Sequence, residues 1–213
     1  MKIKYLAHSA FLITSDSGTR IVTDPYQTSE GLNHGVIKET ADIVTVSHEH
    51  GDHNNVSALQ GNPSVVKTST EVKGIKIKAV PAAHDDKGGS QRGKNTIFCF
   101  EVDGINVCHA GDLGHILTAD QVKTINKVDV LMIPVGGFFT IDAKTATKVC
   151  DQLKPGIIIP MHYKTDKMSF PISGVDEFLR GKSKVTRVNG SEIEIQAGKL
   201  PAAAQIMVLK ASL

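Results

Sequence analysis

Three of the nine histidines of this chain fall within six residues, in the segment HEHGDH at positions 48–53. Imidazole and carboxylate groups are common ligands of divalent metal ions. The apolar run 43–46 predicts a buried strand, so the segment is expected on the loop after that strand. His48 and His50 lie two residues apart and point the same way in an extended chain, so both could bind one ion.

The second half of the segment favours a second metal position. Gly51 allows a turn that bulkier residues resist, and the turn would aim Asp52 and His53 a few ångströms away from the first position. The helical zinc-protease motif does not fit, because Asp52 stands where that motif needs its second histidine. The alternative is a polar surface loop with histidines gathered by chance. We therefore predict that one loop contributes ligands to two metal ions.

The elements that must position this loop are strands in the first half of the chain. β-Branched runs separated by turn residues predict strands at 3–7, 11–14, 20–23, 41–47, 64–67 and 75–80. Residues 96–102 and 105–109 flank Asp103-Gly104, a pair typical of two-residue turns, and predict a β-hairpin.

Helices and strands alternate after the hairpin. The pattern predicts helices at 119–125, 142–153 and 175–179, and strands at 128–133, 156–159, 184–188, 192–195 and 206–209. The apolar residues of helix 142–153 form one stripe, as in a helix that covers a sheet. We expect one domain over residues 1–213, built from mixed sheets covered by helices.

The segment at 48–53 resembles the signature of the metallo-β-lactamase superfamily, His-x-His-x-Asp-His, at all four positions. Three later residues follow predicted strands in the order that this resemblance implies, namely His84, Asp112 and His162. Short stretches such as Thr-Asp-Pro and Pro-Met-His-Tyr resemble the compact branch that includes ascorbate-phosphate lactonase-like proteins and other metal-dependent hydrolases. The implied fold is α/β, a four-layer αββα sandwich of two mixed β-sheets with the metals at one edge.

The resemblance also implies two ligand sets. The first ion would take His48, His50 and His84, the second would take Asp52, His53 and His162, and Asp112 would bridge both ions. Asp24 would support the site from behind its ligands. We expect two divalent metal ions, zinc first, with manganese or iron as alternatives because no ligand is a cysteine.

The expected chemistry is hydrolysis. A hydroxide held by the two ions would attack an ester, lactone, amide or phosphoester, with Asp52 and Asp112 as catalytic residues that position it. Covalent catalysis is disfavoured, because the sequence has no Gly-x-Ser-x-Gly elbow and no Walker loop. A phosphodiesterase or nuclease on the same site and a noncatalytic metal-binding protein are the alternatives. A redox diiron protein is disfavoured, since such relatives usually carry glutamate where His50 stands.

Four further residues are candidates for catalysis or substrate binding. His115, three residues after Asp112, could reach the metals, or it could cap the following helix. Tyr163 could donate to a developing oxyanion, or it could pack at the wall of the site. Arg92 and Asn95, on loop 85–95, could bind an anionic group of the substrate, although the loop could also be merely mobile and solvated.

The amino-acid composition restricts the kinds of binding partner and the cellular location that we expect. The 24 basic and 22 acidic residues leave a formal charge of +2, which argues against a dedicated nucleic-acid surface. No segment is apolar enough to predict a membrane helix. The three cysteines are an odd number in apolar surroundings and indicate thiols in a reducing compartment, which we take to be the cytoplasm. We expect a small-molecule substrate and leave open a homo-oligomer that uses the apolar tail 202–213.

Overall fold

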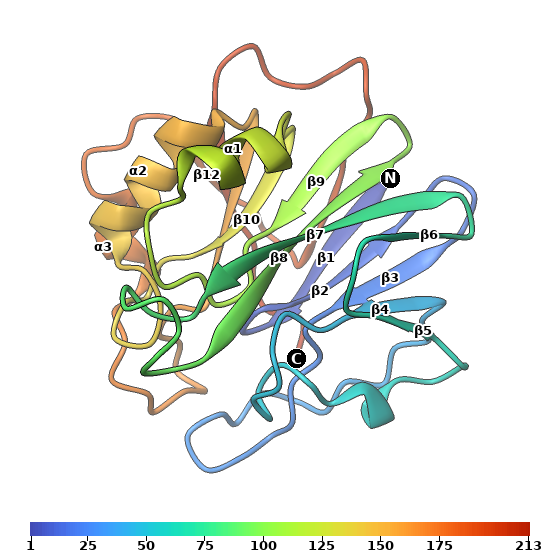
Figure 1. Ribbon diagram of the computed structural model, residues 1–213, viewed down its shortest axis with the longest axis horizontal. Coiled ribbons are helices and arrows are strands. Elements are labelled where there is room, and N and C mark those ends of the chain that lie inside the picture. Colours follow the sequence, from blue (N-terminus) through green and yellow to red (C-terminus); the bar gives the residue numbers. More distant parts are fainter.

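The computed structural model describes residues 1–213, and its core is two mixed β-sheets packed face to face (Figure 1). The six strands of the first sheet run in the order β13-β1-β2-β3-β4-β5. Their bounds are Glu192–Glu194, Lys2–Ala7, Ala10–Thr14, Arg20–Thr23, Ile43–Thr45 and Ser64–Val66. The pairs from β3 to β5 are parallel and the others are antiparallel.

The second sheet has eight strands in the order β12-β14-β11-β10-β9-β8-β7-β6. In that order they span Val185–Arg187, Gln205–Val208, Ile157–Met161, Val130–Pro134, Ile105–His109, Lys94–Val102, Ile75–Ala83 and Thr70–Val72. Strands β12 to β9 pair in parallel, and β9 to β6 pair antiparallel. The predicted α/β class with two mixed sheets is confirmed.

The predicted β8–β9 hairpin is present with the expected turn. Val102 pairs with Ile105 across Asp103 and Gly104. Both turn residues have positive φ, 52° and 74°, as a type I′ turn requires. The hairpin matters for the site because the buried Asn95 lies at the start of β8, one residue after Lys94, while β9 leads directly to Asp112.

The space between the sheets holds a buried apolar cluster. Strand residues of alternate positions supply it, including Ile3, Ile21 and Ile43 from the first sheet and Phe98 and Met132 from the second. Alternation of side chains along each strand puts these residues on the inner face and leaves the other face for an outer layer. The cluster therefore fixes both sheets, and with them the loops at one shared edge.

Three helices cover the outer face of the second sheet, on one side of the molecule (Figure 1). They are α1 (Ala119–Ile125), α2 (Ala143–Leu153) and α3 (Val175–Leu179). Thr118 and Gln121 form a capping box at the start of α1, and Asp142 caps α2 by accepting from the Thr145 N–H. The buried residues of α2 form the predicted stripe. No helix of the structure is both long and apolar enough to cross a membrane.

The outer face of the first sheet differs from a full αββα arrangement. The apolar side chains on this face pack under loops and under the single 3₁₀ turn η1 (Val56–Ala58), and no α-helix covers them. The covering loops contribute apolar residues such as Leu32 and Ile37. The covering segments are rich in glycine, asparagine and proline, which disfavour helices. The sequence patterns also missed the short strand β6. The tail beyond β14 packs on its own chain, where Leu213 N–H donates to Leu6 O.

Candidate metal centre

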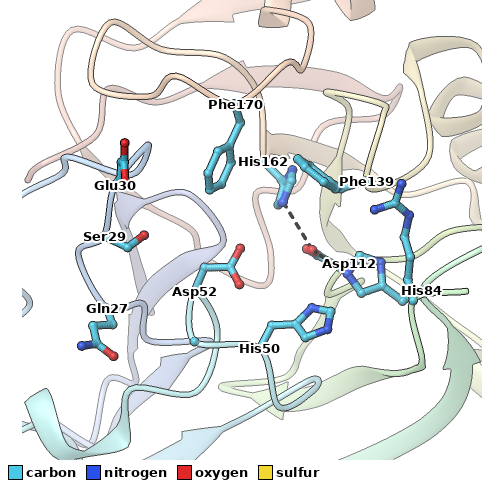
Figure 2. Close-up of a pocket in the computed structure, with 12 residues that line it drawn as sticks. Gln27, Ser29, Glu30, His50, Asp52, His84, Asp112, Phe139, His162 and Phe170 are labelled. Atoms are coloured by element: carbon cyan, nitrogen blue, oxygen red, sulfur yellow. Dashed lines mark ion pairs between the residues drawn. The ribbon is translucent and has the colours of Figure 1, made fainter.

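The seven predicted ligands meet at one edge of the two sheets, although four different loops carry them. The segment 48–53 follows β4 of the first sheet, His84 follows β7, Asp112 follows β9 and His162 follows β11. Figure 2 shows His50, Asp52, His84, Asp112 and His162 around one cavity. Strands that end at the same edge place their following loops together, so residues distant in sequence become neighbours.

Asp112 lies at the centre of the cluster. Its Oδ2 atom is 3.3 Å from the Nε2 atoms of His53, His84 and His162, and 4.0 Å from Nε2 of His48. The Asp112 side chain is buried. One carboxylate thus faces imidazoles from both expected ligand sets, as a bridging ligand would.

The donor atoms form three compact groups, one of which joins Asp24 to His48 and His53, and the other two contain the predicted sets. His48, His50 and His84 make one group, and Asp52, His53 and His162 make another together with His8. Within each group the ligand atoms all lie within 4.8 Å of one another. Each group therefore offers at least three nitrogen or oxygen donors, the usual number in a catalytic site that keeps a position for water.

The hydrogen bonding of the cluster fits metal ligation. His48 Nε2, His53 Nε2 and Asp112 Oδ1 are buried without a hydrogen-bond partner. Buried polar atoms are rarely left unpaired in proteins, because each costs about 1–3 kcal/mol. Three such atoms aimed into one histidine cluster indicate that divalent ions complete the site.

The Nδ1 atoms of His48 and His53 have hydrogen-bond partners on the side of the ring away from Nε2. Nδ1 of His48 lies 2.9 Å from Ser47 Oγ, and Nδ1 of His53 lies 2.9 Å from Asp24 Oδ2. Asp24 also accepts from the Ser47 backbone N–H at 2.8 Å. These contacts fix the ring orientations and leave Nε2 for a metal, which is the usual arrangement around histidine ligands. The predicted supporting role of Asp24 agrees with this geometry.

The electrostatics of the cluster favour a neutral His48 beside an ionised Asp112. Burial, aided by the neighbouring His53, lowers the pKa of His48 to about 3. Burial opposes ionisation of Asp112, but the imidazoles of His162 and His53 hold its pKa well below the usual range. His53 is the exception, because Asp112 and Asp24 raise its pKa well above the usual value despite burial. Asp112 is thus an ionised carboxylate among imidazoles, a place where a cation would bind.

Asn95 positions the central aspartate. Asn95 Nδ2 donates to Ala110 O at 2.9 Å, and Asn95 Oδ1 accepts from the Asp112 N–H at 3.0 Å. A Cβ atom at Gly111 would lie 2.4 Å from Asn95 Oδ1, so only glycine fits between them. The Asn95 side chain is buried and both ends of its amide are used. This corrects its expected role in substrate binding to a structural one.

The structure does not bring His115 and Tyr163 to the site. His115 Nε2 accepts from the Ala83 N–H at 3.1 Å, and Nδ1 donates to Ile116 O at 2.8 Å, so backbone groups use both nitrogens. Tyr163 Oη lies 3.5 Å from Leu209 O and lines a different cavity. Neither side chain lines the cavity that contains Asp112, which argues against the catalytic roles expected for them.

The loop after His84, expected to be solvated, is organised by a single carboxylate. Asp85 accepts from the backbone N–H groups of Lys87, Gly89, Gln91 and Arg92 at 2.7–2.9 Å. This turn places Arg92 at the cavity, where its guanidinium lies 4.9 Å from the centre of the Phe139 ring. The sequence signal that was missed is an aspartate at the start of a glycine-rich loop.

The Asp85 turn should depend on pH in metal-free protein. Burial opposes ionisation, but the four backbone donors lower the pKa of Asp85 to about 2. A carboxylate with a depressed pKa stabilises the folded state above its unfolded pKa of about 3.9 and loses that effect as the pH falls through the folded value. Asp85→Asn should therefore flatten the pH dependence of the unfolding midpoint between about pH 4 and 2. The measurement is the urea midpoint of unfolding at several pH values. A midpoint that depends on pH as steeply in Asp85→Asn as in wild type would contradict this role of Asp85.

His8, which none of the sequence motifs includes, lies against the ligands of the second group. Its Nε2 atom lies 3.1 Å from Asp52 Oδ2, and its ring packs 4.3 Å from the His162 ring centroid. The residue has a φ of 57°, and its carbonyl accepts from the His162 N–H at 2.9 Å. A strained backbone thus holds His8 against two ligands of the second group.

Replacing His8 with asparagine should weaken the second site without unfolding the protein. Asparagine tolerates positive φ, and its shorter amide cannot reach Asp52 in the same way. Loss of residues that orient metal ligands typically costs about 10–100-fold in metal affinity or activity. We expect a loss of that size in zinc affinity, measured by competition with a chromophoric chelator. His34→Asn, at a buried histidine bonded to the tail, is the matched control and should retain wild-type affinity.

The cavity at the centre has a volume of about 420 Å³ and two unlike walls (Figure 2). Phe139 and Phe170 form an aromatic wall, with ring centroids 5.7 Å apart. Gln27, Ser29 and Glu30 line another, polar side of the cavity. The floor is the histidine and aspartate cluster, so a bound molecule would contact metal ligands, aromatic rings and polar groups at once.

Comparison with known proteins identifies the class that this fold and site define. A family model described as a beta-lactamase superfamily domain matches residues 2–162. A solved structure from Thermotoga maritima, assigned to the metallo-β-lactamase superfamily, has a TM-score of 0.82 and 39% sequence identity. That similarity covers 98% of this chain and 97% of the other. The chain belongs to the metallo-β-lactamase superfamily.

Curated relatives define the family more narrowly. A UPF0173 metal-dependent hydrolase of Pelotomaculum thermopropionicum is 31% identical and is aligned over 92% of this chain and 96% of its own length. A UPF0173 metal-dependent hydrolase of Pyrococcus abyssi is also 31% identical, over 92% of this chain and 100% of its own. Within the superfamily, the chain belongs to this family of metal-dependent hydrolases.

Proposed function

We propose that the protein hydrolyses an ester, lactone, amide or phosphoester with water activated by two divalent metal ions. Zinc is the metal that we propose for both positions. The observation that carries the proposal is the convergence of six other predicted ligands around Asp112, with the buried Nε2 atoms of His48 and His53 left unpaired. Divalent ions held by these residues would lower the pKa of a bound water toward about 7 and stabilise negative charge on the attacked oxygen.

The residues of the chain would have distinct tasks in this reaction. His48, His50 and His84 would hold one ion, and Asp52, His53 and His162 the other. Asp52 is the ligand carboxylate that reaches solvent, with 26% of its side chain exposed, so its oxygens can orient the attacking water and accept its proton. Asp112 is buried, and its backbone N–H donates to Asn95, so its carboxylate would stay fixed between the two ligand sets. None of the donors is a thiolate, so manganese or iron could substitute for zinc.

The proposed substrate is a small molecule with an anionic group. The cavity of about 420 Å³ suits a small molecule, and Phe139 and Phe170 offer an apolar surface beside the cluster. Arg92 donates to Phe138 O at 3.0 Å and lines the same cavity, so its remaining N–H groups can bind a carboxylate or phosphate. The charge balance and the single arginine at the cavity disfavour a long nucleic-acid substrate. The three cysteines support the cytoplasm as the proposed location.

Arg92→Met should separate anion binding from chemistry. Methionine keeps much of the packing against Phe139 but removes the charge. We expect KM for an anionic ester to rise by about tenfold or more, since charge-assisted hydrogen bonds contribute about 1.5–3 kcal/mol, while kcat changes little. The measurement compares an anionic ester with its neutral methyl analogue. Equal effects on both substrates would show that Arg92 only shapes the loop.

The function itself is tested by a substrate screen with metal-loaded protein. Lactones, carboxylic and thioesters, phosphodiesters and β-lactams would be assayed after separate reconstitution with zinc, manganese and iron. Turnover of an ester or lactone that disappears on metal removal supports the proposal. Turnover confined to phosphodiesters would narrow the proposed function to that of a phosphodiesterase. Two bound ions without turnover of any class would favour a noncatalytic metal-binding protein.

A further inference from the structure

Two of the three thiols face each other across the β8–β9 hairpin, outside the metal centre. Cys99 of β8 is the direct register partner of Cys108 of β9. Val102 and Ile105 flank the two-residue turn and form a hydrogen-bonded pair. Because hydrogen-bonded and non-hydrogen-bonded pairs alternate along an antiparallel ladder, Cys99 and Cys108 form a non-hydrogen-bonded pair. Such pairs have the closer side chains, with Cα atoms about 4.5 Å apart.

We propose that Cys99 and Cys108 are a reactive dithiol that forms a reversible cross-strand disulfide with small-molecule disulfides. The Cα separation of a non-hydrogen-bonded pair falls at the lower end of the roughly 4.4–6.8 Å range of disulfides. Both side chains leave the hairpin on the same outer face, because residues directly opposite in a ladder point the same way. The backbone therefore needs no rearrangement to bring the sulfurs together.

The surroundings make Cys99 the attacking sulfur. Cys99 is partly exposed and lines a surface cavity of about 720 Å³, whereas Cys108 is buried beneath it. Three lysines and two glutamates line the same cavity. Lys76 and Lys127 are paired with carboxylates, whereas Lys78 is not, so the Lys78 ammonium would attract an anionic disulfide such as oxidised glutathione. The neighbouring Cys108 thiol lowers the pKa of Cys99 against the effect of burial, and the Lys78 ammonium adds to this.

The third cysteine supplies an internal comparison. Cys150 lies in α2, with no cysteine opposite it, and burial raises the pKa of its thiol to about 12. The thiolate is the nucleophile in disulfide exchange, so Cys150 should react slowly. Reactivity confined to the hairpin pair would therefore reflect the geometry of that pair and not a general property of the cysteines.

The exchange proceeds in two balanced steps. The Cys99 thiolate attacks one sulfur of oxidised glutathione, forming a mixed disulfide and releasing one glutathione thiolate. The Cys108 thiol then loses its proton, its sulfur attacks Cys99 Sγ, and the second glutathione leaves. The two protein thiols are oxidised to one disulfide while oxidised glutathione is reduced to two glutathione molecules.

The test treats the full-length protein with oxidised glutathione and follows it by intact mass and thiol titration. Wild type should lose two of its three thiols, gain no lasting adduct, and yield a cross-linked peptide pair from β8 and β9 that dithiothreitol separates. Cys108→Ser should instead retain one glutathione on Cys99. Cys99→Ser should stay unmodified over the same time, and Cys150→Ser should behave as wild type.

Two further observations keep the proposal open to refutation. Circular dichroism and thermal unfolding of each variant would show whether it is folded before treatment. A folded Cys108→Ser protein that takes up no glutathione, or a wild-type protein that reacts first at Cys150, would overturn the proposal. Disulfides between chains in place of the intramolecular bridge would overturn it as well.

Discussion

Asp112→Ala should abolish hydrolysis and reduce metal binding, the largest effect we expect from any single substitution. The Asp112 carboxylate lies 3.3 Å from the Nε2 atoms of His53, His84 and His162 and is the one group that faces both ligand sets. Removal of a residue that only orients metal ligands lowers metal affinity or activity by about 10–100-fold. Removal of a direct bridging ligand should therefore lower kcat/KM by more than about 100-fold. Metal analysis of the same protein should find fewer than two ions per chain.

Asp129→Asn provides the matched control for that substitution. Asp129 is also a buried aspartate, but it accepts from the backbone and side chain of Asn106, away from the metal centre. This variant should lose stability while it keeps its metals and its kcat/KM. An Asp112→Ala protein that is folded and retains wild-type turnover would contradict the central role of Asp112.

Removal of metal should produce the second large effect. Chelation should bring turnover below detection, and zinc should restore it. Each site filled at free metal of about 100 times its Kd stabilises the folded state by about 2.7 kcal/mol. For a protein of this size, 1 kcal/mol corresponds to about 2–4 °C, so each filled site should raise Tm by about 5–11 °C.

The thermal measurement separates metal binding from catalysis. Differential scanning calorimetry of chelated and reconstituted wild type should show the full shift, and His8→Asn should need more zinc to reach it. Turnover that survives exhaustive chelation would contradict a metal-activated water. A Tm that does not respond to any of the three metals would contradict binding at the cluster.

The sequence predicted those features that depend on local spacing. The two-residue turn at Asp103-Gly104 set the register of β8 and β9, because a type I′ turn allows only one pairing of its flanking residues. The segment 48–53 follows a strand, and the later ligands also follow strands. Once such strands lie in two facing sheets, their ends share one edge, so the predicted ligands come together.

Other features depend on side-chain directions that spacing does not specify. His115 lies three residues from Asp112, yet its ring is held by the backbone at Ala83 and Ile116. Tyr163 follows His162 directly, but His162 has a φ of 49° and the next side chain leaves the cavity. His8 shows the converse, since a residue 40 positions before the cluster contacts Asp52 through folding of the whole chain.

The layer that covers the outer face of the first sheet could not be predicted from the resemblance. The resemblance implied helices on both outer faces, but the residues over the first sheet lack a helical apolar stripe, and single side chains such as Tyr26 and Leu59 cover it. Apolar side chains from irregular segments can bury a sheet face as well as a helix can, because burial depends on area and not on secondary structure. The local sequence therefore determined this layer more than the fold class did.

Anomalous diffraction from crystals grown with zinc tests the central claim most directly. The account predicts two peaks about 3.5–4 Å apart, one within bonding distance of His48, His50 and His84 and the other of Asp52, His53 and His162, with Asp112 between them. Zinc bound only at surface carboxylates, while these side chains keep to hydrogen bonds among themselves, would contradict it.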